Sequence, residues 1–323
     1  MIDEGDRKKT AFCTIVTADY LPFAKTLFKS LRKFDSNILA FVLIVDSPTS
    51  GSLDDLIPVT LEELQDVPLS QEIIRRYRKN PNALRWSLKS ILLIHLLKTS
   101  KFEQVFFVDP DLYFYSDFKF LYEELCDHAF LLSPHWGCMH PKKSEVYFQR
   151  LMTDGLYNAG FLGATAKGLP TLQWWADSCL RACERDKSRG LHDDQGYLNL
   201  FPILSPDTKI LNHRGCNVAE WNRFEVSRSF DEHGNLILDE IYPLVFIHFS
   251  NLGYLVEHDP LLVPFLQAYE KELRKNGFTR SLMEPAQGFV RRNRLKNLTF
   301  LERVVRKLVG ERKFSIIKGW NID

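Results

Sequence analysis

Two aspartates beside a run of apolar residues have the type and spacing of metal ligands. Asp109 and Asp111 flank Pro110 and directly follow the apolar residues 105–108. Such a run is typical of a central strand covered on both faces. A parallel sheet has its ligand crevice at the carboxyl ends of its strands, and side chains two apart on an extended segment point the same way. The pair therefore predicts hard oxygen ligands for Mn²⁺ or Mg²⁺ that also holds phosphate.

Further polar side chains occur later in the chain. Asp193, Asp194 and Gln195 form a cluster that would be costly to bury without a purpose, although capping of a following helix would also explain an aspartate here. His248 lies within the apolar run 245–250. A lone histidine there is usually structural, but beside two aspartates it would complete a metal site.

Basic and small residues are also candidates for ligand contact. Arg85 and Lys89 are spaced i,i+4 on a predicted helix at 82–97, where they could bind phosphate or carboxylate or form a solvated face. The small residues within 157–163 would let the backbone approach a ligand closely. His135, in a predicted loop, could bond a sugar.

The elements that must position these residues suggest an α/β sheet. Strands are predicted at 11–16 and 39–45, with a helix opening at Pro22 between them, which is a βαβ pattern. The turn after the first strand has no Gly-rich loop, so neither a P-loop nor a dinucleotide fingerprint is present. Further helices are expected at 118–125, at 172–183 and from Pro260 onward, and a strand at 129–133.

Composition bounds the protein class. The 323 residues are 45% hydrophobic, enough for one large domain or a domain with an appendage. Their six cysteines lack metal-site spacing, so we expect reduced thiols. The polar N-terminus and the lack of eighteen consecutive apolar residues predict a cytoplasmic protein without a membrane span. The six cysteines are Cys13, Cys126, Cys138, Cys179, Cys183 and Cys216.

The positive charge is concentrated near the C-terminus. Residues 291–318 hold ten Lys/Arg and two Glu, a local charge of +8 within a total of +1. An apolar stripe at 301–308 makes this segment resemble a helix that lies on an anionic membrane surface. A packed C-terminal helix with a solvated face is the alternative. No nucleic-acid partner is predicted.

Taken in order, these motifs resemble the nucleotide-sugar glycosyltransferases of the GT-A fold, and family eight in particular, which contains glycogenin-like and bacterial galactosyltransferase-like retaining enzymes. The resemblance runs from about residue 11 to about 255. It implies a mixed α/β sheet flanked by helices over 1–258, followed by a helical appendage with a basic tail at 259–323. It also implies transfer of a sugar from a nucleotide diphosphate, UDP being expected, to a glycan, lipid-linked glycan or protein acceptor.

The resemblance assigns roles to individual positions. Asp109, Asp111 and His248 match the metal ligands, and Asp194 and Gln195 match the Asp-Gln pair facing the anomeric carbon. Retention of configuration is implied, whereas an inverting enzyme would use Asp193 or Asp194 as general base. The remaining expected donor contacts are Thr17, Asp19, Tyr20, Asp46, Arg85, Lys89, Asn158, Ala159 and Gly160.

The chain departs from the family at two places. Gly196 replaces the acid that usually follows the Asp-Gln pair, and His248 is followed by Phe-Ser-Asn-Leu-Gly without the family's Lys-Pro-Trp. The donor sugar is therefore not assigned. A nucleotidyltransferase, which normally has a Gly-rich basic turn after its first strand, and a non-catalytic carbohydrate-binding or scaffold protein remain as alternatives.

Overall fold

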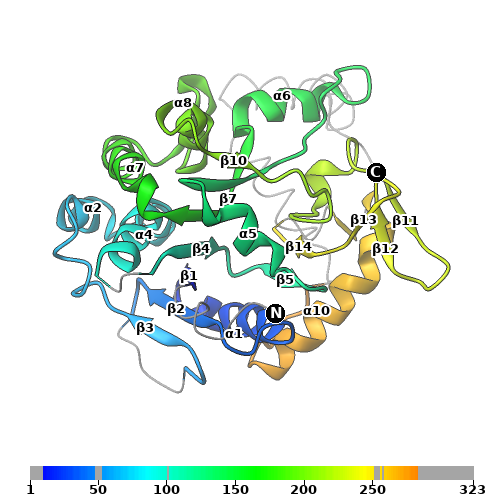
Figure 1. Cartoon of the computed structure of the whole chain (residues 1–323), viewed down its shortest axis with the longest axis horizontal. Coiled ribbons are helices and arrows are strands. Elements are labelled where there is room, and N and C mark those ends of the chain that lie inside the picture. The colour runs from blue at the N-terminus through cyan, green and yellow to red at the C-terminus, as the bar shows by residue number, and fades with distance from the viewer. Residues whose placement is uncertain (1–9, 48–52, 100–101, 251–254, 257, 283–323) are drawn as a thin grey trace, which may run out of the picture. The chain divides into compact units, whose positions relative to one another are not determined.

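A seven-stranded mixed sheet forms the centre of the protein. The computed structural model describes residues 10–47, 53–99, 102–250, 255–256 and 258–282. The strand order is β10-β6-β7-β4-β1-β2-β3, and only β7 runs antiparallel to its neighbours. The predicted mixed α/β sheet flanked by helices is confirmed (Figure 1). The strands are β1 (Thr10–Val16), β2 (Leu39–Ile44), β3 (Ile57–Val59), β4 (Gln104–Val108), β6 (Phe130–Pro134), β7 (Tyr157–Thr165) and β10 (Lys209–Ile210).

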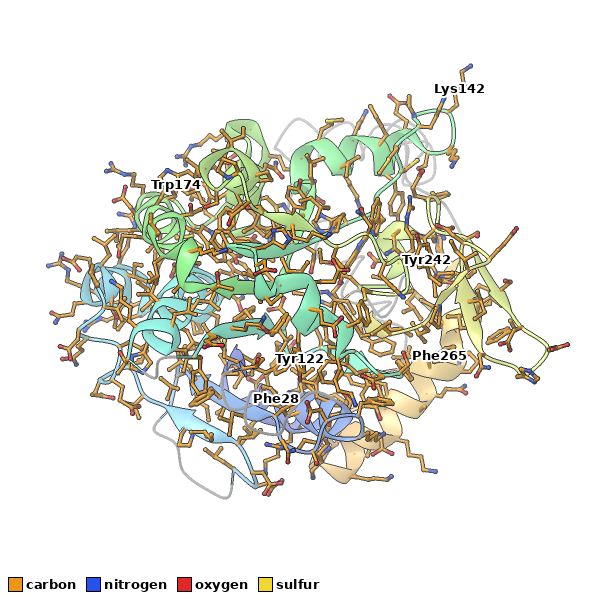
Figure 2. All side chains as sticks on the ribbon, in the orientation of Figure 1. Phe28, Tyr122, Lys142, Trp174, Tyr242 and Phe265 are labelled. Carbon is orange, nitrogen blue, oxygen red and sulfur yellow. The ribbon has the colours of Figure 1, made fainter. Side chains whose placement is uncertain are left out.

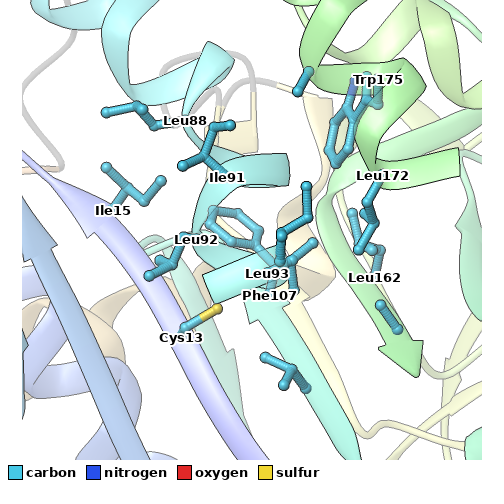
Figure 3. Packing of buried hydrophobic residues seen from close by; sticks show 14 of the residues in the cluster. Cys13, Ile15, Leu88, Ile91, Leu92, Leu93, Phe107, Leu162, Leu172 and Trp175 are labelled. Atoms are coloured by element: carbon cyan, nitrogen blue, oxygen red, sulfur yellow. The ribbon is translucent and has the colours of Figure 1, made fainter. Parts of the chain in front are cut away.

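Helices cover both faces of this sheet. Alternate residues of β1 point to opposite sides: Cys13 packs among residues of α4 (Lys89–Lys98) and α7 (Leu169–Arg181), and Phe12 among residues of α1 (Leu21–Arg32) and α5 (Phe120–Cys126). Figure 3 shows the first of these clusters. In Figure 2, Trp174 lies on the side of the sheet that Cys13 faces, and Phe28 lies on the side that Phe12 faces. Burial on both faces explains why residues 105–108 of β4 are all apolar.

The first βαβ unit is confirmed. β1 and β2 pair in parallel, and α1 begins at Leu21 with Pro22 in its first turn, where proline's missing N–H costs nothing. The single helix predicted at 82–97 is wrong. The structure has α3 (Pro81–Ser87) and α4, which meet at Leu88. The Ser87 hydroxyl bonds back to the carbonyls of Ala83 and Leu84, which competes with the regular helix ladder.

Short strands complete the fold beside the main sheet. β5 (Leu112–Phe114) pairs antiparallel with β14 (Phe246–His248), and a three-stranded sheet precedes β14. The strand β7 was not predicted, since the small residues within 157–163 indicated only a close approach of the backbone to a ligand. The remaining elements are α2 (Ser70–Tyr77), α6 (Glu145–Asp154), β8 (Arg185–Asp186), β9 (Leu191–His192), α8 (Phe201–Leu204), β11 (Arg228–Phe230), β12 (Leu236–Leu238), β13 (Tyr242–Pro243) and α10 (Val263–Lys275).

The compact unit that contains the main sheet extends to Arg280. The reason is α10, which packs on α1: Tyr269 contacts Phe23 edge to face, and Asn276 donates to the Thr26 hydroxyl at 2.8 Å. A second unit comprises Ser281–Asp323. The predicted basic segment 291–318 lies outside the described residues.

Two further expectations concern the thiols and the membrane. All six cysteines are free, and only Cys126 is exposed. Within the described ranges, no helix combines the length and apolar character needed to cross a bilayer.

Candidate active site

The ends of β4 and β14 bring the two aspartates and the histidine together. In the β5–β14 pair, His248 lies opposite Leu112, the residue after Asp111. The Phe249 amide donates to the Asp111 carbonyl at 2.9 Å, and the Asp109 amide donates to the Gly160 carbonyl at 2.7 Å. One ligand atom from each of Asp109, Asp111 and His248 lies within 4.8 Å of the others. The three predicted metal ligands therefore form one cluster.

This cluster fits a divalent cation such as Mn²⁺ or Mg²⁺. It offers two carboxylates and one imidazole, the donor types that suit such ions. Asn217 Oδ1 lies 3.2 Å from His248 Nδ1, which assigns the proton to Nδ1 and leaves Nε2, 3.1 Å from Asp111 Oδ1, as the ligand atom. Burial lowers the pKa of His248, but the hydrogen bond to Asp111 and the negative charges of Asp111 and Asp109 together raise it overall.

Gly160 allows the cluster to form. A Cβ at this position would lie 2.4 Å from His248 Cε1 and 2.8 Å from Asp109 Oδ2, far inside van der Waals contact. Only glycine leaves room for both ligands beside β7. The close approach predicted for 157–163 is therefore to the metal cluster's own side chains.

Lys89 is a buried cation between two carboxylates. Its Nζ lies 3.3 Å from Asp109 Oδ1 and 3.2 Å from Asp194 Oδ2, and it donates to the Ala159 carbonyl at 3.0 Å. Only 4% of the residue is exposed, so the solvated-face interpretation is wrong for Lys89. Burial alone would lower its pKa, but the charges of Asp109 and Asp194 raise it overall.

Arg85 points elsewhere. Its Nη2 donates to Asn82 Oδ1 at 2.7 Å, and its guanidinium lies 5.5 Å from the ring centre of Tyr20. The break at Leu88 separates the directions of Arg85 and Lys89, so these two cations contact different parts of the site.

Asp193 and Asp194 are adjacent but have different partners. Asp193 accepts from Arg185 Nε at 2.6 Å, with its backbone held at a φ of 41°. Asp194 is 1% exposed and its carbonyl accepts from the Trp175 indole N–H at 2.9 Å. Burial raises the pKa of Asp194 to about 8, with Lys89 opposing the shift and Asp193 adding to it. A turn and a 3₁₀ helix (Gln195–Leu200) follow, where a regular helix was expected.

Gln195 and Asn158 belong to one hydrogen-bond network. Gln195 Oε1 accepts from the Ala159 amide at 3.2 Å and Asn158 Nδ2 at 3.3 Å, while its Nε2 donates to the Asp154 carbonyl at 2.7 Å. Asn158 Oδ1 accepts from the Gly160 amide at 2.9 Å. These bonds fix the backbone of β7 beside the metal ligands.

His135 supports this network. Its Nδ1 lies 2.7 Å from the Gly155 carbonyl, so it carries the proton, and its Nε2 lies 3.2 Å from Asn158 Nδ2 and accepts from it. Burial lowers the pKa of His135 to about 4. Both ring nitrogens are therefore used within the protein, which leaves the sugar contact suggested by the sequence without a free donor or acceptor on this ring.

The expected nucleotide contacts lie at the ends of β1 and β2. Asp46 Oδ1 accepts from the Ala18 amide at 2.9 Å, and Thr17 Oγ1 donates to Asp19 Oδ1 at 2.6 Å. Tyr20 stacks on Phe23 and is 37% exposed. Burial raises the pKa of Tyr20, and the charge of Asp111 raises it further. The turn therefore lies within electrostatic reach of the metal cluster.

Two supporting residues were not assigned from the sequence. Asn217, which orients His248, has a φ of 58° and is fully buried. Trp221 packs edge to face against His248 and His135, with ring centres 5.1 and 5.6 Å apart. No sequence signal marked Asn217, because neither its left-handed φ nor its burial can be read from the sequence.

Fold and site together define a mixed α/β protein with an Asp–Asp–His cluster at the end of a central strand. The mixed α/β sheet and the cluster of Asp109, Asp111 and His248 that the sequence led us to expect are both present. The chain is 31% identical over 253 residues to the uncharacterized protein YfnF of Bacillus subtilis (strain 168), covering 76% of this chain and 82% of that protein. It belongs to the same family as YfnF.

Other comparisons concern family models and solved structures. No protein-family model matches the chain. The apo form of mouse xyloside xylosyltransferase 1 is 11% identical and covers 75% of this chain and 98% of its own, with a TM-score of 0.44. The galactosyltransferase LgtC, in complex with donor and acceptor sugar analogues, is 16% identical and covers 84% of this chain and 97% of its own, with a TM-score of 0.45.

Proposed function

We propose that this protein is a metal-dependent glycosyltransferase that moves a sugar from a nucleotide diphosphate, UDP being favoured, to a glycan, lipid-linked glycan or protein acceptor. The single observation that carries this proposal is the convergence of Asp109, Asp111 and His248 beside the buried Lys89–Asp194 pair. Metal-ligating carboxylates next to a fixed cation suit a diphosphate leaving group.

The donor would lie along the carboxyl ends of the central strands. The turn after β1, with Thr17, Asp19 and Tyr20, would hold the nucleoside, together with Asp46. Arg85 would cover the Tyr20 side of the base or ribose. The backbone of Asn158, Ala159 and Gly160 would line the sugar, because β7 passes directly beside the metal ligands.

The chemistry requires stabilisation of a departing diphosphate. A bound divalent cation would supply Lewis-acid stabilisation of that charge. Lys89 holds Asp109 in place and adds a fixed positive charge beside it. Gln195 and Asn158 keep the β7 backbone in a single arrangement, so the sugar would meet a preorganised surface.

The surroundings of Asp193 and Asp194 favour a retaining reaction over an inverting one. An inverting reaction needs a carboxylate free to take the acceptor proton. Asp193 is paired with Arg185 at 2.6 Å. Burial raises the pKa of Asp193, but Arg185 and the neighbouring His192 and Lys89 together lower it overall. Asp194 is buried against Lys89. With both engaged, the leaving phosphate is the better proton acceptor, as in a retaining reaction.

The test is metal-dependent nucleotide binding, measured as a shift in melting temperature. UDP and GDP, and sugars linked to each, would be added with and without Mn²⁺. Ligand at 100 times its Kd should stabilise the folded state by about 2.7 kcal/mol. The Asp111→Asn variant should lose the Mn²⁺-dependent shift. The control Asp117→Asn, which removes an exposed carboxylate paired with Lys119, should retain it.

Hydrolysis of the bound nucleotide sugar would then identify the donor. No shift with any nucleotide would contradict the proposal and favour a binding or scaffold role. Release of pyrophosphate from a nucleoside triphosphate and a sugar phosphate would favour a nucleotidyltransferase instead.

For the acceptor, we propose a glycan or glycolipid at the cytoplasmic membrane face. The support is the charge of the segment 291–318, in which Lys and Arg outnumber Glu by eight. A chain without residues 291–323 should lose binding to vesicles that contain anionic lipid. Unchanged binding to those vesicles would contradict a membrane role for this segment.

A further inference from the structure

The residue before Asp194 has a strained backbone. Asp193 lies between β9 and the 3₁₀ helix that begins at Gln195, and its φ is 41°. Residues other than glycine are uncommon at positive φ because their Cβ crowds the backbone, although aspartate tolerates this region better than most. Such a conformation persists only where the surrounding structure fixes it. The contacts of Asp193 therefore show what fixes this turn.

Three hydrogen bonds hold Asp193 in place. Its amide donates to the Glu184 carbonyl at 2.9 Å, and its Oδ1 accepts from the Gln195 amide at 3.3 Å. Its Oδ2 accepts from Arg185 Nε at 2.6 Å, and its side chain is only 4% exposed. Of these three partners, only Arg185 contributes a side chain. Its bond is also the charge-assisted one, which is the strongest kind.

Arg185 is itself fixed by its surroundings. β8 pairs with β9 in antiparallel orientation, so Arg185 lies opposite His192. The Arg185 guanidinium lies 4.9 Å from the ring centre of Trp86, within the range of a cation–π contact. Trp86 belongs to α3. Arg185 therefore connects α3 with the turn that contains Asp193.

This turn directs two residues of the candidate active site. Asp194 Oδ2 lies 3.2 Å from Lys89 Nζ, and Gln195 Oε1 accepts from the Ala159 amide at 3.2 Å. Both side chains follow Asp193 directly, so a rotation about its φ would change the direction of each. A return to an ordinary negative φ would move them relative to Lys89 and β7.

Arg185 lies outside the metal cluster. It is on β8 and its side chain is 59% exposed, whereas the metal ligands lie at the ends of β4 and β14. An effect of Arg185 on the reacting sugar would therefore pass through Asp193 and the turn that it holds.

We propose that Arg185 is a positioning residue that holds the Asp193 turn, so that Asp194 faces Lys89 and Gln195 faces β7 during sugar transfer. Its role in transfer rests on the proposed glycosyltransferase function. Its hold on the turn does not, and hydrogen exchange measures that hold without any substrate.

Hydrogen exchange is the first part of the test. In Arg185→Met, which lacks the donor to Asp193, the amides of Gln195 and Ala159 should exchange about tenfold faster than in the wild type. Arg185→Lys keeps the charge and can still donate, although without the fixed geometry of a guanidinium. Its exchange should lie between that of Arg185→Met and that of the wild type.

The control is Arg181→Met on α7. Arg181 forms an exposed ion pair with Asp177 at 3.1 Å, and its side chain is 76% exposed. The substitution removes the same charge as Arg185→Met from a nearby part of the chain. It should leave both exchange and hydrolysis as in the wild type.

The second part of the test separates nucleotide binding from positioning of the sugar. The probes are UDP and whichever of UDP-glucose, UDP-galactose and UDP-N-acetylglucosamine the wild type hydrolyses fastest with Mn²⁺. Because UDP has no sugar, Arg185→Met should keep the Mn²⁺-dependent UDP shift in melting temperature. Its kcat for hydrolysis should fall about 10- to 100-fold with little change in KM, since small displacements of positioning groups have effects of this size. Arg185→Lys should recover part of the kcat.

A double substitution tests whether Arg185 acts through Asp193. Asp193→Gly accepts a φ of 41° without strain but has no carboxylate to pair with Arg185. Adding Arg185→Met to Asp193→Gly should lower kcat no further, as expected of two residues that share one contact. If the two losses multiply, Arg185 acts independently of Asp193 and the proposal is wrong.

The outcomes separate this proposal from the glycosyltransferase proposal. If the wild type shows neither a UDP shift nor hydrolysis, the glycosyltransferase proposal fails and the role in transfer fails with it, while faster exchange in Arg185→Met still supports the hold on the turn. If the wild type shows both but Arg185→Met exchanges and hydrolyses as the wild type does, only the positioning role is overturned. Loss of the UDP shift in both Arg185→Met and Arg185→Lys would also overturn it.

Discussion

Lys89 and Asp194 form a buried ion pair, with Nζ 3.2 Å from Oδ2, and Lys89 also lies 3.3 Å from Asp109 Oδ1. One cation thus connects a metal ligand with the residue expected to face the reacting sugar. The pair lies between α4 and the turn after β9, so it also joins two parts of the chain that are far apart in sequence.

Replacing Lys89 by Met should destabilise the protein in a pH-dependent manner. Removing one partner of a buried pair typically costs about 3–5 kcal/mol. Near pH 8 the substitution leaves Asp109 and Asp194 without the cation that they share. Near pH 5 the substitution should lower the free energy of unfolding by less, because the pKa of Asp194 is about 8 and its carboxyl is mostly protonated at that pH.

Urea unfolding of Lys89→Met at pH 5 and pH 8 measures this difference. Lys98→Met, at the exposed end of the same helix, is the control and should have little effect at either pH. An equal loss of stability at both pH values would mean that Asp194 is not the partner whose charge matters.

Replacing Gly160 by Ala should disrupt metal binding more than folding. The added Cβ would meet His248 Cε1 at 2.4 Å and Asp109 Oδ2 at 2.8 Å, so both ligands must move. We expect Mn²⁺ affinity to fall about 10- to 100-fold, the range for disturbed support of metal ligands. Gly196→Ala is the matched control, since its Cβ would meet only His192 Cβ, at 3.9 Å.

Titration calorimetry with Mn²⁺ would measure both variants. Wild-type affinity in Gly160→Ala would show that the three ligands do not bind the ion in the observed arrangement.

Much of this fold could be predicted because its central strands are buried on both faces. The run 105–108 and the helix at Pro22 follow directly from apolar pattern and proline position. β7 could not be predicted in the same way, because Asn158, Ala159 and Gly160 have low strand propensity. They form a strand because β4 and β6 pair with it on both sides.

The metal ligands could likewise be proposed from residue type and order, whereas their support could not. Asn217 orients His248 across 31 positions, and Lys89 reaches Asp194 through the fold. Such contacts depend on tertiary packing that local sequence does not encode.

Metal binding should weaken in acid through His248. The proton and the metal compete for Nε2, and the pKa of His248 is shifted upward by Asp111 despite the opposing effect of burial. The Kd for Mn²⁺ should therefore rise as the pH falls through this raised pKa. In His248→Gln, affinity should be lower throughout and this part of the pH dependence should disappear. Identical pH profiles for the two proteins, measured by calorimetry, would exclude His248 as a ligand.

Acid stability should depend on His135. Burial lowers its pKa from 6.5 to about 4, so the unfolded chain takes up this proton first as the pH falls. The contribution of His135 to stability is complete above pH 6.5 and is lost between 6.5 and 4, at about 1.4 kcal/mol per pH unit and about 3 kcal/mol in all. His135→Gln can still donate and accept, but it does not titrate.

Urea unfolding between pH 7 and pH 4.5 would compare wild type, His135→Gln and the exposed control His233→Gln. The wild type and the control should lose stability more steeply than His135→Gln, because only His135→Gln lacks the buried titrating ring. If His135→Gln loses stability as steeply as the wild type, the ring is not held neutral by its bonds to Gly155 and Asn158. The network that positions β7 would then need a different account.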